Sequence, residues 1–288
     1  MAYDDSIRPS KNSYIIDADS PAEMARLLDL HRLITKSRGE LFPEEAASGE
    51  MLDILDIACA TGGWVLDMAQ KYPDAEVIGI DVSNHMVEYA HAYALVKGLY
   101  NAHFEQMDAL KPLDFDDASF DLVNARALVG FMNPEAWTDL LRETYRICRP
   151  GGSICLNEGE MPITNSPAFE KLSGLFVRAL KLAGRSFSPD GRNFGITPML
   201  TRLLREAGYQ NIQQKPYLID FSAGTEVRDG WYQDFMIGFM MGSPFIINMD
   251  LITKEDFQAT YRQMLAEMLK DTFCGVGFSL AVWGQKPS

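Results

Sequence analysis

Three aspartates stand at or near the ends of short apolar runs, and their positions indicate a ligand site. Asp56 lies in a run that begins at Met51, and Asp81 and Asp108 end two later runs. Short aliphatic runs bounded by turn-forming residues are typical of buried strands. Ligands of open α/β sheets bind beyond the carboxyl ends of the strands, so these carboxylates are expected at one binding edge.

A carboxylate at the end of the second strand suits a ribose. It accepts hydrogen bonds from two adjacent hydroxyl groups, and Asp81 lies roughly 20 residues after the turn that contains Gly62. Structural roles remain open for all three acids. Asp81 could cap the helix that follows Ser83, Asp108 could be a turn residue, and Asp56 could hold the turn itself or an ammonium group of the ligand.

The segment from Ile54 to Trp64 joins a strand to a helix through small residues. Its turn reads Ala-Cys-Ala-Thr-Gly-Gly, and a helix is predicted from Trp64 to Tyr72, ended by Pro73. Small residues allow the backbone to approach a ligand closely, and the helix N-terminus faces that ligand. This turn is therefore the expected centre of the binding site.

Further strands and helices alternate with short links, which predicts right-handed crossovers and a mostly parallel sheet. Before the first strand, Ser20-Pro-Ala-Glu predicts the start of a helix that runs to about Lys36 and ends at Gly39. The other predicted helices cover 85–97, 134–148, 168–183 and 197–207, and the other strands cover 120–126, 153–157, 209–221 and 278–284.

The bulk composition excludes several classes of partner. The chain has 288 residues, a net charge of −14 and a pI of about 4.7, and so acidic a surface disfavours nucleic acid and anionic membranes. Its four cysteines form no CxxC pair, which favours free thiols and no metal. The start has no signal-peptide pattern, and the longest apolar stretch, 235–249, is too short for a membrane span. A cytoplasmic protein is expected.

Five segments, in order and at the expected spacing, resemble the class I S-adenosylmethionine-dependent methyltransferases that act on small molecules, such as the ubiquinone and menaquinone C-methyltransferases. The resemblance covers residues 50–158 best. The segments are Leu-Asp56-Ile-Ala-Cys-Ala-Thr-Gly62-Gly, Gly-Ile-Asp81-Val-Ser-Asn-His-Met86, Met107-Asp108-Ala109, Phe120-Asp-Leu-Val-Asn124-Ala-Arg126 and Arg149-Pro-Gly-Gly152.

The resemblance implies a doubly wound α/β fold, a mostly parallel seven-stranded Rossmann-like sheet with strand order 3-2-1-4-5-7-6 and a helical lid. Residues 1–48 form an arm and a helix that acts as a lid or dimer contact. Residues 49–160 form the S-adenosylmethionine-binding core, and residues 161–288 complete the sheet and add a lid insertion at about 222–270.

The resemblance also implies roles for the site residues. The loop from Asp56 to Gly62 holds the methionine part of the cofactor, Asp81 holds the ribose, and Asp108 bonds the adenine amine. The remaining cofactor contacts are expected from Ala58, Ala60, Val82, Met86, Met107, Ala109, Asn124 and Arg126. The family usually has Gly at the positions of Ala58 and Ala60, and the added Cβ at Ala60 could weaken cofactor binding, since Gly there allows positive φ.

Methyl transfer from a sulfonium needs mainly proximity and in-line orientation, so no catalytic pair is obligatory. For an acceptor that must lose a proton, the candidate general bases or closing residues are Glu158, His31 and Tyr14. His85, His91 and His103 favour surface or packing roles. Substrate contacts are expected from Phe131, Glu160, Trp231, Phe235 and Phe239, because aromatic and methionine-rich segments adapt to irregular apolar ligands.

The predicted function is methyl transfer to a small, apolar metabolite of natural-product or quinone-like type. Three alternatives remain for the whole chain or its insertion. A cyclisation could accompany or replace methylation, the chain could be an inactive cofactor-binding scaffold, and the aromatic insertion could be a packing element or dimer contact.

Overall fold

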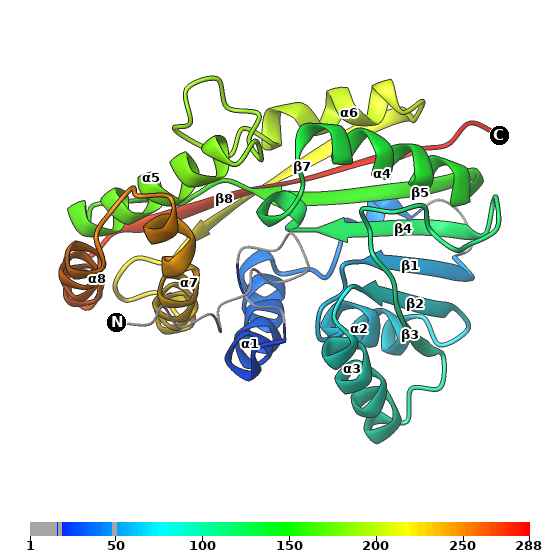
Figure 1. The fold of residues 1–288 in the computed structure, drawn as a ribbon. Coiled ribbons are helices and arrows are strands. Elements are labelled where there is room, and N and C mark those ends of the chain that lie inside the picture. The colour runs from blue at the N-terminus through cyan, green and yellow to red at the C-terminus, as the bar shows by residue number, and fades with distance from the viewer. Residues whose placement is uncertain (1–15, 17–18, 48–50) are drawn as a thin grey trace, which may run out of the picture.

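The computed structural model describes residue 16, residues 19–47 and residues 51–288 (Figure 1). The predicted closing residue Tyr14 lies outside these described residues. Within them the chain forms a mixed α/β fold around one central sheet.

The described residues form one sheet of eight strands in the order β3-β2-β1-β4-β5-β8-β6, with β7 pairing β8. β1 to β5 are parallel, and β8 runs antiparallel to its neighbours. Since β6 has only two residues, the long strands reproduce the predicted order. The strands are β1 Asp53–Ile57, β2 Glu76–Asp81, β3 Ala102–Gln106, β4 Phe120–Arg126, β5 Cys148–Gly159, β6 Ile163–Thr164, β7 Gln210–Asp220 and β8 Gly275–Gln285.

Helices cover both faces of the sheet, with α4 and α6 on one side and α2 and α3 on the other (Figure 1). They are α1 Pro21–Arg38, α2 Gly63–Lys71, α3 Asn84–Lys97, α4 Pro134–Ile147, α5 Pro167–Leu182, α6 Leu200–Glu206, α7 Arg228–Asn248 and α8 Lys254–Met268, with 3₁₀ turns at Glu44–Ala46, Leu128–Gly130 and Thr197–Met199.

Helical periodicity explains how each layer packs. In α4, Trp137, Leu140, Leu141 and Thr144 recur at helical spacing and are all buried against the sheet. Trp64 of α2 occupies the equivalent place on the opposite face. Two apolar layers therefore hold the sheet between them, and the strand ends remain as the edges where a site can form.

Local start signals are confirmed at one helix and only partly at another. The Ser83 hydroxyl accepts a hydrogen bond from the Met86 N–H at 3.3 Å, so Ser83 caps α3 as predicted. Ser20 occupies the capping position of α1 but makes no side-chain capping bond, and Glu23 instead pairs with Arg26. The start of α1 is thus set by Pro21 and by its packing.

The predicted insertion at 222–270 consists of α7 and α8. Together with α5 they form a separate aromatic cluster at one end of the molecule (Figure 1). Phe169 of α5 stacks edge-to-face on Phe235 and Phe239 of α7, with ring centroids 5.0 and 5.3 Å apart. α7 also lies beside α1, and we call α1 and α7 the lid helices because they face the cavity described below.

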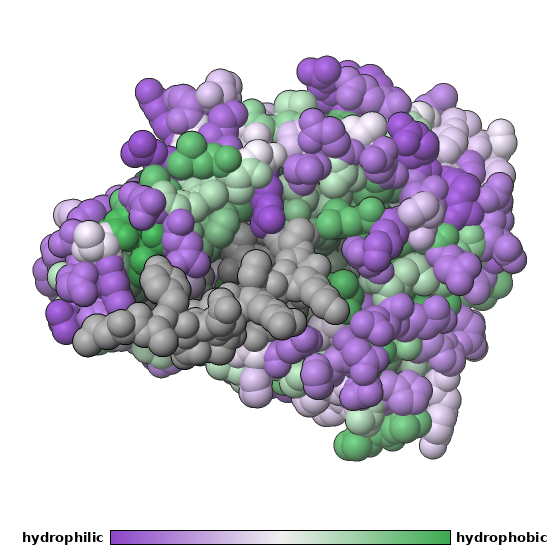
Figure 2. All heavy atoms as spheres, viewed as in Figure 1, coloured by the Kyte–Doolittle hydropathy of each residue, from purple (hydrophilic) through white to green (hydrophobic). Residues whose placement is uncertain are grey.

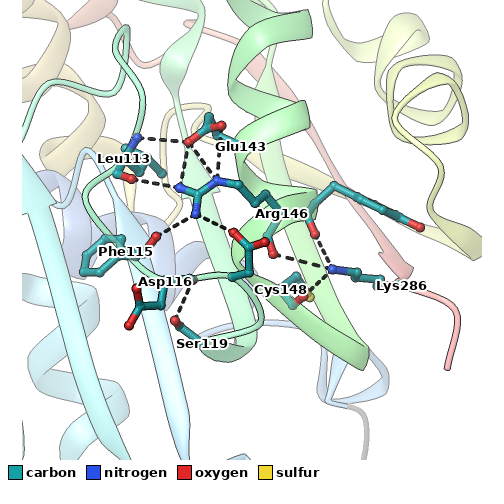
Figure 3. Close-up of polar contacts among 10 residues, drawn as sticks. Leu113, Phe115, Asp116, Ser119, Glu143, Arg146, Cys148 and Lys286 are labelled. Atoms are coloured by element: carbon teal, nitrogen blue, oxygen red, sulfur yellow. Dashed lines mark hydrogen bonds and ion pairs between the residues drawn. The ribbon is translucent and has the colours of Figure 1, made fainter.

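Ion pairs close the amino-terminal edge of the sheet (Figure 3). Arg146 of α4 pairs with Glu143 at 2.9 Å and with Asp117 at 3.0 Å, and it donates to the carbonyl oxygens of Leu113 and Phe115. Lys286 donates to the carbonyl oxygens of Tyr145, in the last turn of α4, and of Cys148, directly after it, a favourable place for a cation. The carboxyl-terminal edge is left for a ligand.

Outside the residues drawn in grey, hydrophilic side chains make up much of the face shown in Figure 2. Within the described ranges, none of the helices is long and apolar enough to cross a membrane.

Candidate functional site

A cavity of about 580 Å³ opens at the carboxyl ends of the parallel strands, within the usual size range of small-molecule sites. Its floor comes from the loops after β1, β2 and β3 and from the ends of β4, β5 and β8. The lid helices α1 and α7 close its other side. The site therefore lies at the edge where the sequence placed it.

The loop after β1 has a left-handed backbone at three of its residues. Ala58 has φ 55°, Ala60 has φ 50° and Gly62 has φ 75°. A left-handed conformation costs a residue with a Cβ about 1–2 kcal/mol. Both alanines line the cavity, so the loop adopts this shape in spite of the side chains that replace the expected glycines.

Gly62 is fixed by packing as well as by its φ. A Cβ there would lie 2.8 Å from the Cβ of Ala90 and would also collide with the ring of Phe104. Gly62 caps α2 and does not itself line the cavity. Because Gly62 has positive φ and no side chain, α2 can begin directly after the loop and pack closely against Phe104 and Ala90.

Asp81 is anchored so that its carboxylate lines the cavity. Its Oδ2 accepts from the Ala60 N–H and its Oδ1 from the Ser83 N–H, each at 2.9 Å. Burial raises the pKa of Asp81, and the backbone donors oppose that rise. Each carboxylate oxygen retains accepting capacity, as recognition of two hydroxyl groups requires.

The wall beside Asp81 is formed by the other residues predicted for the nucleoside. Asp108 bonds the Leu110 N–H at 3.0 Å and pairs with Lys111 at 3.3 Å. Met86 is almost fully buried, whereas Val82 is partly exposed. The predicted residues on this wall are Val82, Met86, Met107, Asp108 and Ala109.

Asp56 and Asn124 lie behind the loop and are not among the residues that line the cavity. The Asn124 amide donates to Asp56 Oδ1 at 2.7 Å, and both side chains are buried. Burial raises the pKa of Asp56 to about 6, and the positive charge of Arg126 opposes this. The structure thus gives these two residues a supporting position rather than the predicted direct contact.

Arg126 does line the cavity, at the end of β4. Its guanidinium lies 6.0 Å from the ring centroid of Trp64, and its Nε has no hydrogen-bond partner. Burial lowers its pKa, while Asp56 raises it. Among the described residues no carboxylate lies within ion-pair distance of it, so its charge is open to a ligand.

Glu158 does not face the cavity, contrary to the prediction that it could act on the acceptor. Its carboxylate accepts from the Leu128 N–H at 2.6 Å and, more weakly, from the Val129 N–H. Burial raises its pKa to about 8. Alternate residues of a strand point to opposite faces, so its neighbours Asn157 and Gly159 line the cavity instead.

Glu160 lines the cavity, but its carboxylate is already engaged. It accepts hydrogen bonds from the N–H groups of Phe194, Gly195 and Thr197 and from the Thr197 hydroxyl. Glu160 therefore orders the 194–197 loop, which leaves it little capacity to bind a substrate.

His31 of α1 lines the cavity and is held by an acid from α2. Its Nε2 lies 2.8 Å from Asp67 Oδ2, and its buried Nδ1 has no partner. Burial lowers its pKa despite the opposing effect of Asp67, so the neutral imidazole dominates at pH 7. Asp67 accepts from Nε2–H in that state, which leaves Nδ1 as a proton acceptor.

Of the four aromatic residues expected at the substrate, three line the cavity. Phe131, Trp231 and Phe235 line the cavity, whereas Phe239 is buried among α5, α7 and α8. The histidines expected at the surface are there: His85, His91 and His103 are exposed. No group of His, Cys, Asp and Glu in the described ranges is arranged to hold a metal ion.

Several cavity residues were not predicted from the sequence, among them Arg26, Asp234, Arg38 and Asn157. Arg26 pairs with Asp234 at 2.6 Å and joins the two lid helices, while Arg38 at the end of α1 and Asn157 of β5 line the cavity further along. The available signal was position, because Arg26 and Arg38 lie on the face of α1 that carries Leu27, Leu30 and Ile34. A charged residue on an apolar helix face indicates a polar partner or ligand.

Unpaired buried polar atoms concentrate in this cavity. Of the eight in the described residues, four belong to cavity residues: His31 Nδ1, Arg38 Nε, Arg126 Nε and Asn157 Oδ1. Buried polar groups are normally hydrogen-bonded. Polar groups of α1 and of the strand ends are thus placed to receive a polar ligand, whereas Trp231 and Phe235 of α7 are placed to receive an apolar one.

A family model described as "Methyltransferase domain" matches residues 54–152. Demethylmenaquinone methyltransferase from Geobacillus kaustophilus is 28% identical over 182 residues, which cover 59% of this chain and 75% of the relative.

Two solved structures share the fold. YcgJ from Bacillus subtilis has a TM-score of 0.53 and 17% identity over 85% of this chain and 96% of its own. The [4+2]-cyclase SpnF has a TM-score of 0.52 and 18% identity over 96% of this chain and 88% of its own. At these identities the likeness concerns the fold alone.

Proposed function

Since the chain is a class I S-adenosylmethionine-dependent methyltransferase of the small-molecule type, we propose that it methylates a small acceptor with an apolar body, of natural-product or quinone-like kind. The observation that carries this proposal is the division of the cavity. Its floor carries Asp81 and the left-handed loop, its lid side carries Trp231 and Phe235 of α7, and Phe131 lines it after β4.

The cofactor is S-adenosylmethionine, which supplies a methyl group on a positively charged sulfur that leaves readily. We propose that Asp81 holds its ribose, that Met86, Val82 and Ala109 surround its adenine, and that the 58–62 loop holds its methionine part. Arg126 would bind the methionine carboxylate rather than approach the sulfonium, because like charges repel.

The residues fit this cofactor on the basis of geometry. Asp81 is oriented by two backbone donors and still offers accepting capacity on the cavity side. Arg126 offers an unpaired cation a short distance along the floor, at the end of β4. The Asp81 carboxylate and the Arg126 guanidinium thus lie where the ribose hydroxyls and the methionine carboxylate of the cofactor would bind.

The chain's own contribution to the transfer is mainly orientation and exclusion of water by the lid helices. For an acceptor that must lose a proton, we propose that His31 Nδ1 accepts it. Asp67 would then stabilise the imidazolium through Nε2. Glu158 is not proposed as a base, because its carboxylate faces the backbone of the 128–129 turn.

The structure can be compared with the two alternative functions, cyclisation and an inactive scaffold. The likeness to a cyclase concerns the fold alone and does not favour cyclisation over methylation. An inactive scaffold was suggested by Ala60, but the Ala60 N–H still bonds Asp81 in the left-handed loop. This observation favours a functional cofactor site.

Calorimetry with S-adenosylmethionine, followed by assay of S-adenosylhomocysteine formation, tests the proposal. A demethylmenaquinol-type hydroquinone serves as the apolar acceptor and phosphoethanolamine as the polar comparison. Asp81→Ala should weaken cofactor binding at least about tenfold, since charge-assisted hydrogen bonds are lost. His31→Asn should lower kcat by about 10²-fold or more while leaving cofactor binding nearly unchanged, if a proton is removed.

Absence of cofactor binding by the wild-type protein, or turnover of the polar acceptor alone, would reject the proposal. Conversion of an acceptor without stoichiometric S-adenosylhomocysteine would instead support the cyclisation alternative. Glu158→Gln is the matched control, because that carboxylate does not line the cavity and its loss should leave turnover within about twofold.

A further inference from the structure

A second guanidinium without an ion-pair partner among the described residues, that of Arg38, lies at the β8 end of the cavity. Arg38 is the last residue of α1 and lines the cavity. Its Nη2 donates to the Ser279 hydroxyl at 3.0 Å, its Cζ lies 4.9 Å from the ring centroid of Tyr217, and its Nε has no partner. No carboxylate of the described residues lies within ion-pair distance of it.

The acids around Arg38 are all engaged elsewhere or neutral. Glu40 pairs with Lys215 at 2.7 Å and accepts the Tyr217 hydroxyl. Glu160 accepts four hydrogen bonds from the 194–197 loop. Burial raises the pKa of Glu158 to about 8, so this carboxyl is mostly protonated at pH 7.

Arg38 is nevertheless charged. Burial lowers its pKa to about 10, with a further lowering by the charge of Arg126, and that value still leaves the guanidinium protonated at neutral pH. A buried cation without a counter-ion is unfavourable, so the site gains stability when an anion enters it.

Strand order places Arg38 beyond the reach of the cofactor. Its partner Ser279 lies on β8 opposite Gly159, four strands from the β2 that carries Asp81. Neighbouring strands lie about 4.8 Å apart, so Asp81 and Ser279 are separated by roughly 19 Å. A methionine chain that starts at a ribose on Asp81 covers only about two such spacings, which brings its carboxylate to β4 and Arg126.

We propose that the acceptor carries a carboxylate that binds the Arg38 guanidinium beside the Ser279 hydroxyl, with its apolar body under Trp231 and Phe235 of α7. This inference rests on the proposed function and specifies its substrate class as an amphipathic acid. A guanidinium offers a planar pair of donors that matches a carboxylate. The acid would fix the acceptor at the β8 end and direct its other end toward the cofactor loop.

The test uses matched acid and amide probes with the full-length protein. Binding of 2-naphthoate and 2-naphthamide, and of decanoate and decanamide, is measured by calorimetry in the presence of saturating S-adenosylhomocysteine. In the wild-type protein each acid should bind at least about tenfold more tightly than its amide. Arg38→Met should remove this preference and leave S-adenosylhomocysteine binding within about twofold.

Two further variants separate charge from position. Arg38→Lys should retain part of the preference, since a lysine supplies the charge without the paired donors. Arg32→Met removes an exposed arginine of the same helix and should change neither measurement. Arg126→Met should weaken S-adenosylhomocysteine binding and leave the acid preference in place.

The opposite results overturn the inference. These are equal binding of acid and amide in both pairs, absence of binding by either acid, or an Arg38→Met protein that loses S-adenosylhomocysteine and keeps the acid preference. The last result would assign Arg38 to the cofactor carboxylate. Since the wild-type comparison alone can reject the inference, it remains decisive if Arg38→Met does not fold. Failure of S-adenosylhomocysteine to bind the wild-type protein would count against the proposed function instead.

Discussion

At the residue scale, the two alanines of the loop after β1 show that a backbone shape can survive the loss of the residue that best fits it. Ala58 and Ala60 both have positive φ, and the Ala60 N–H keeps its bond to Asp81. Surrounding packing, including the tightly packed Gly62, holds the loop in this conformation. The alanine at position 60, where the family usually has Gly, therefore adds backbone strain but does not remove the binding site.

Ala60→Gly should stabilise the protein. The substitution removes left-handed backbone strain of about 1–2 kcal/mol from the folded state. Glycine also raises the conformational entropy of the unfolded chain, which costs about 0.4–1 kcal/mol of stability, so the free energy of unfolding should rise by about 0.5–1 kcal/mol. Urea unfolding measures this change. The control is Ala266→Gly in α8, where an exposed helical alanine is lost and the free energy of unfolding should fall by about 1 kcal/mol. A loss of stability in Ala60→Gly would contradict the strain argument.

At the scale of elements, one helix offers a test of how the lid is seated on its support. α7 contains Gly238, which has open space around it, and Gly242, where a Cβ would lie 2.6 Å from the ring of Phe176 on α5. Gly238→Ala should stabilise α7 by about 0.5–1 kcal/mol through helix propensity alone. Gly242→Ala gains the same propensity but overpacks the α5 interface, and should destabilise the protein by about 1–3 kcal/mol.

Thermal unfolding of the two variants compares these effects within one helix. Equal stabilisation by both substitutions would show that α7 is not packed on α5 as described. Turnover should fall in Gly242→Ala more than in Gly238→Ala, because Trp231 and Phe235 of the same helix line the cavity.

The elements also show what sequence patterns could and could not predict. The parallel strands and the Ser83 cap follow from local signals, whereas the wall from Val82 to Ala109 was implied by the family resemblance. Glu158 and Phe239 were misplaced because which side they face depends on partners distant in sequence. Glu158 points away by strand alternation, and Phe239 lies one turn beyond Phe235, against α5.

Arg26 and Arg38 illustrate the same limit from the other side. Their significance arises only when α1 lies against the sheet and α7, where Arg26 meets Asp234 and Arg38 meets Ser279. Nothing in the local sequence of α1 specifies those partners. Contacts between distant segments thus determined the part of the site that the sequence did not reveal.

At the scale of the whole molecule, the cavity lies between two hydrophobic cores, that of the sheet with its helices and that of α5, α7 and α8. The sheet and its helices supply the floor, and the cluster of α5, α7 and α8 supports one wall. α1 lies between them and is tied to α7 by the Arg26–Asp234 pair. A ligand that contacts both floor and lid should therefore couple the stability of segments far apart in the chain.

Ligand-linked hydrogen exchange tests this coupling. S-adenosylhomocysteine at 100 times its Kd should stabilise the protein by about 2.7 kcal/mol, and the added protection should extend from the 58–63 loop into α1. Adding 2-naphthoate should then extend it into α7, because Trp231 and Phe235 would contact the acid's ring. Asp81→Ala, measured at the same ligand concentration, should lose about half or more of the stabilisation by S-adenosylhomocysteine, since a tenfold higher Kd leaves about 1.4 kcal/mol. Protection that stays within residues 53–126 under both ligands would show that α1 and α7 do not close on the site, since a lid that contacts its ligand must share in the stabilisation.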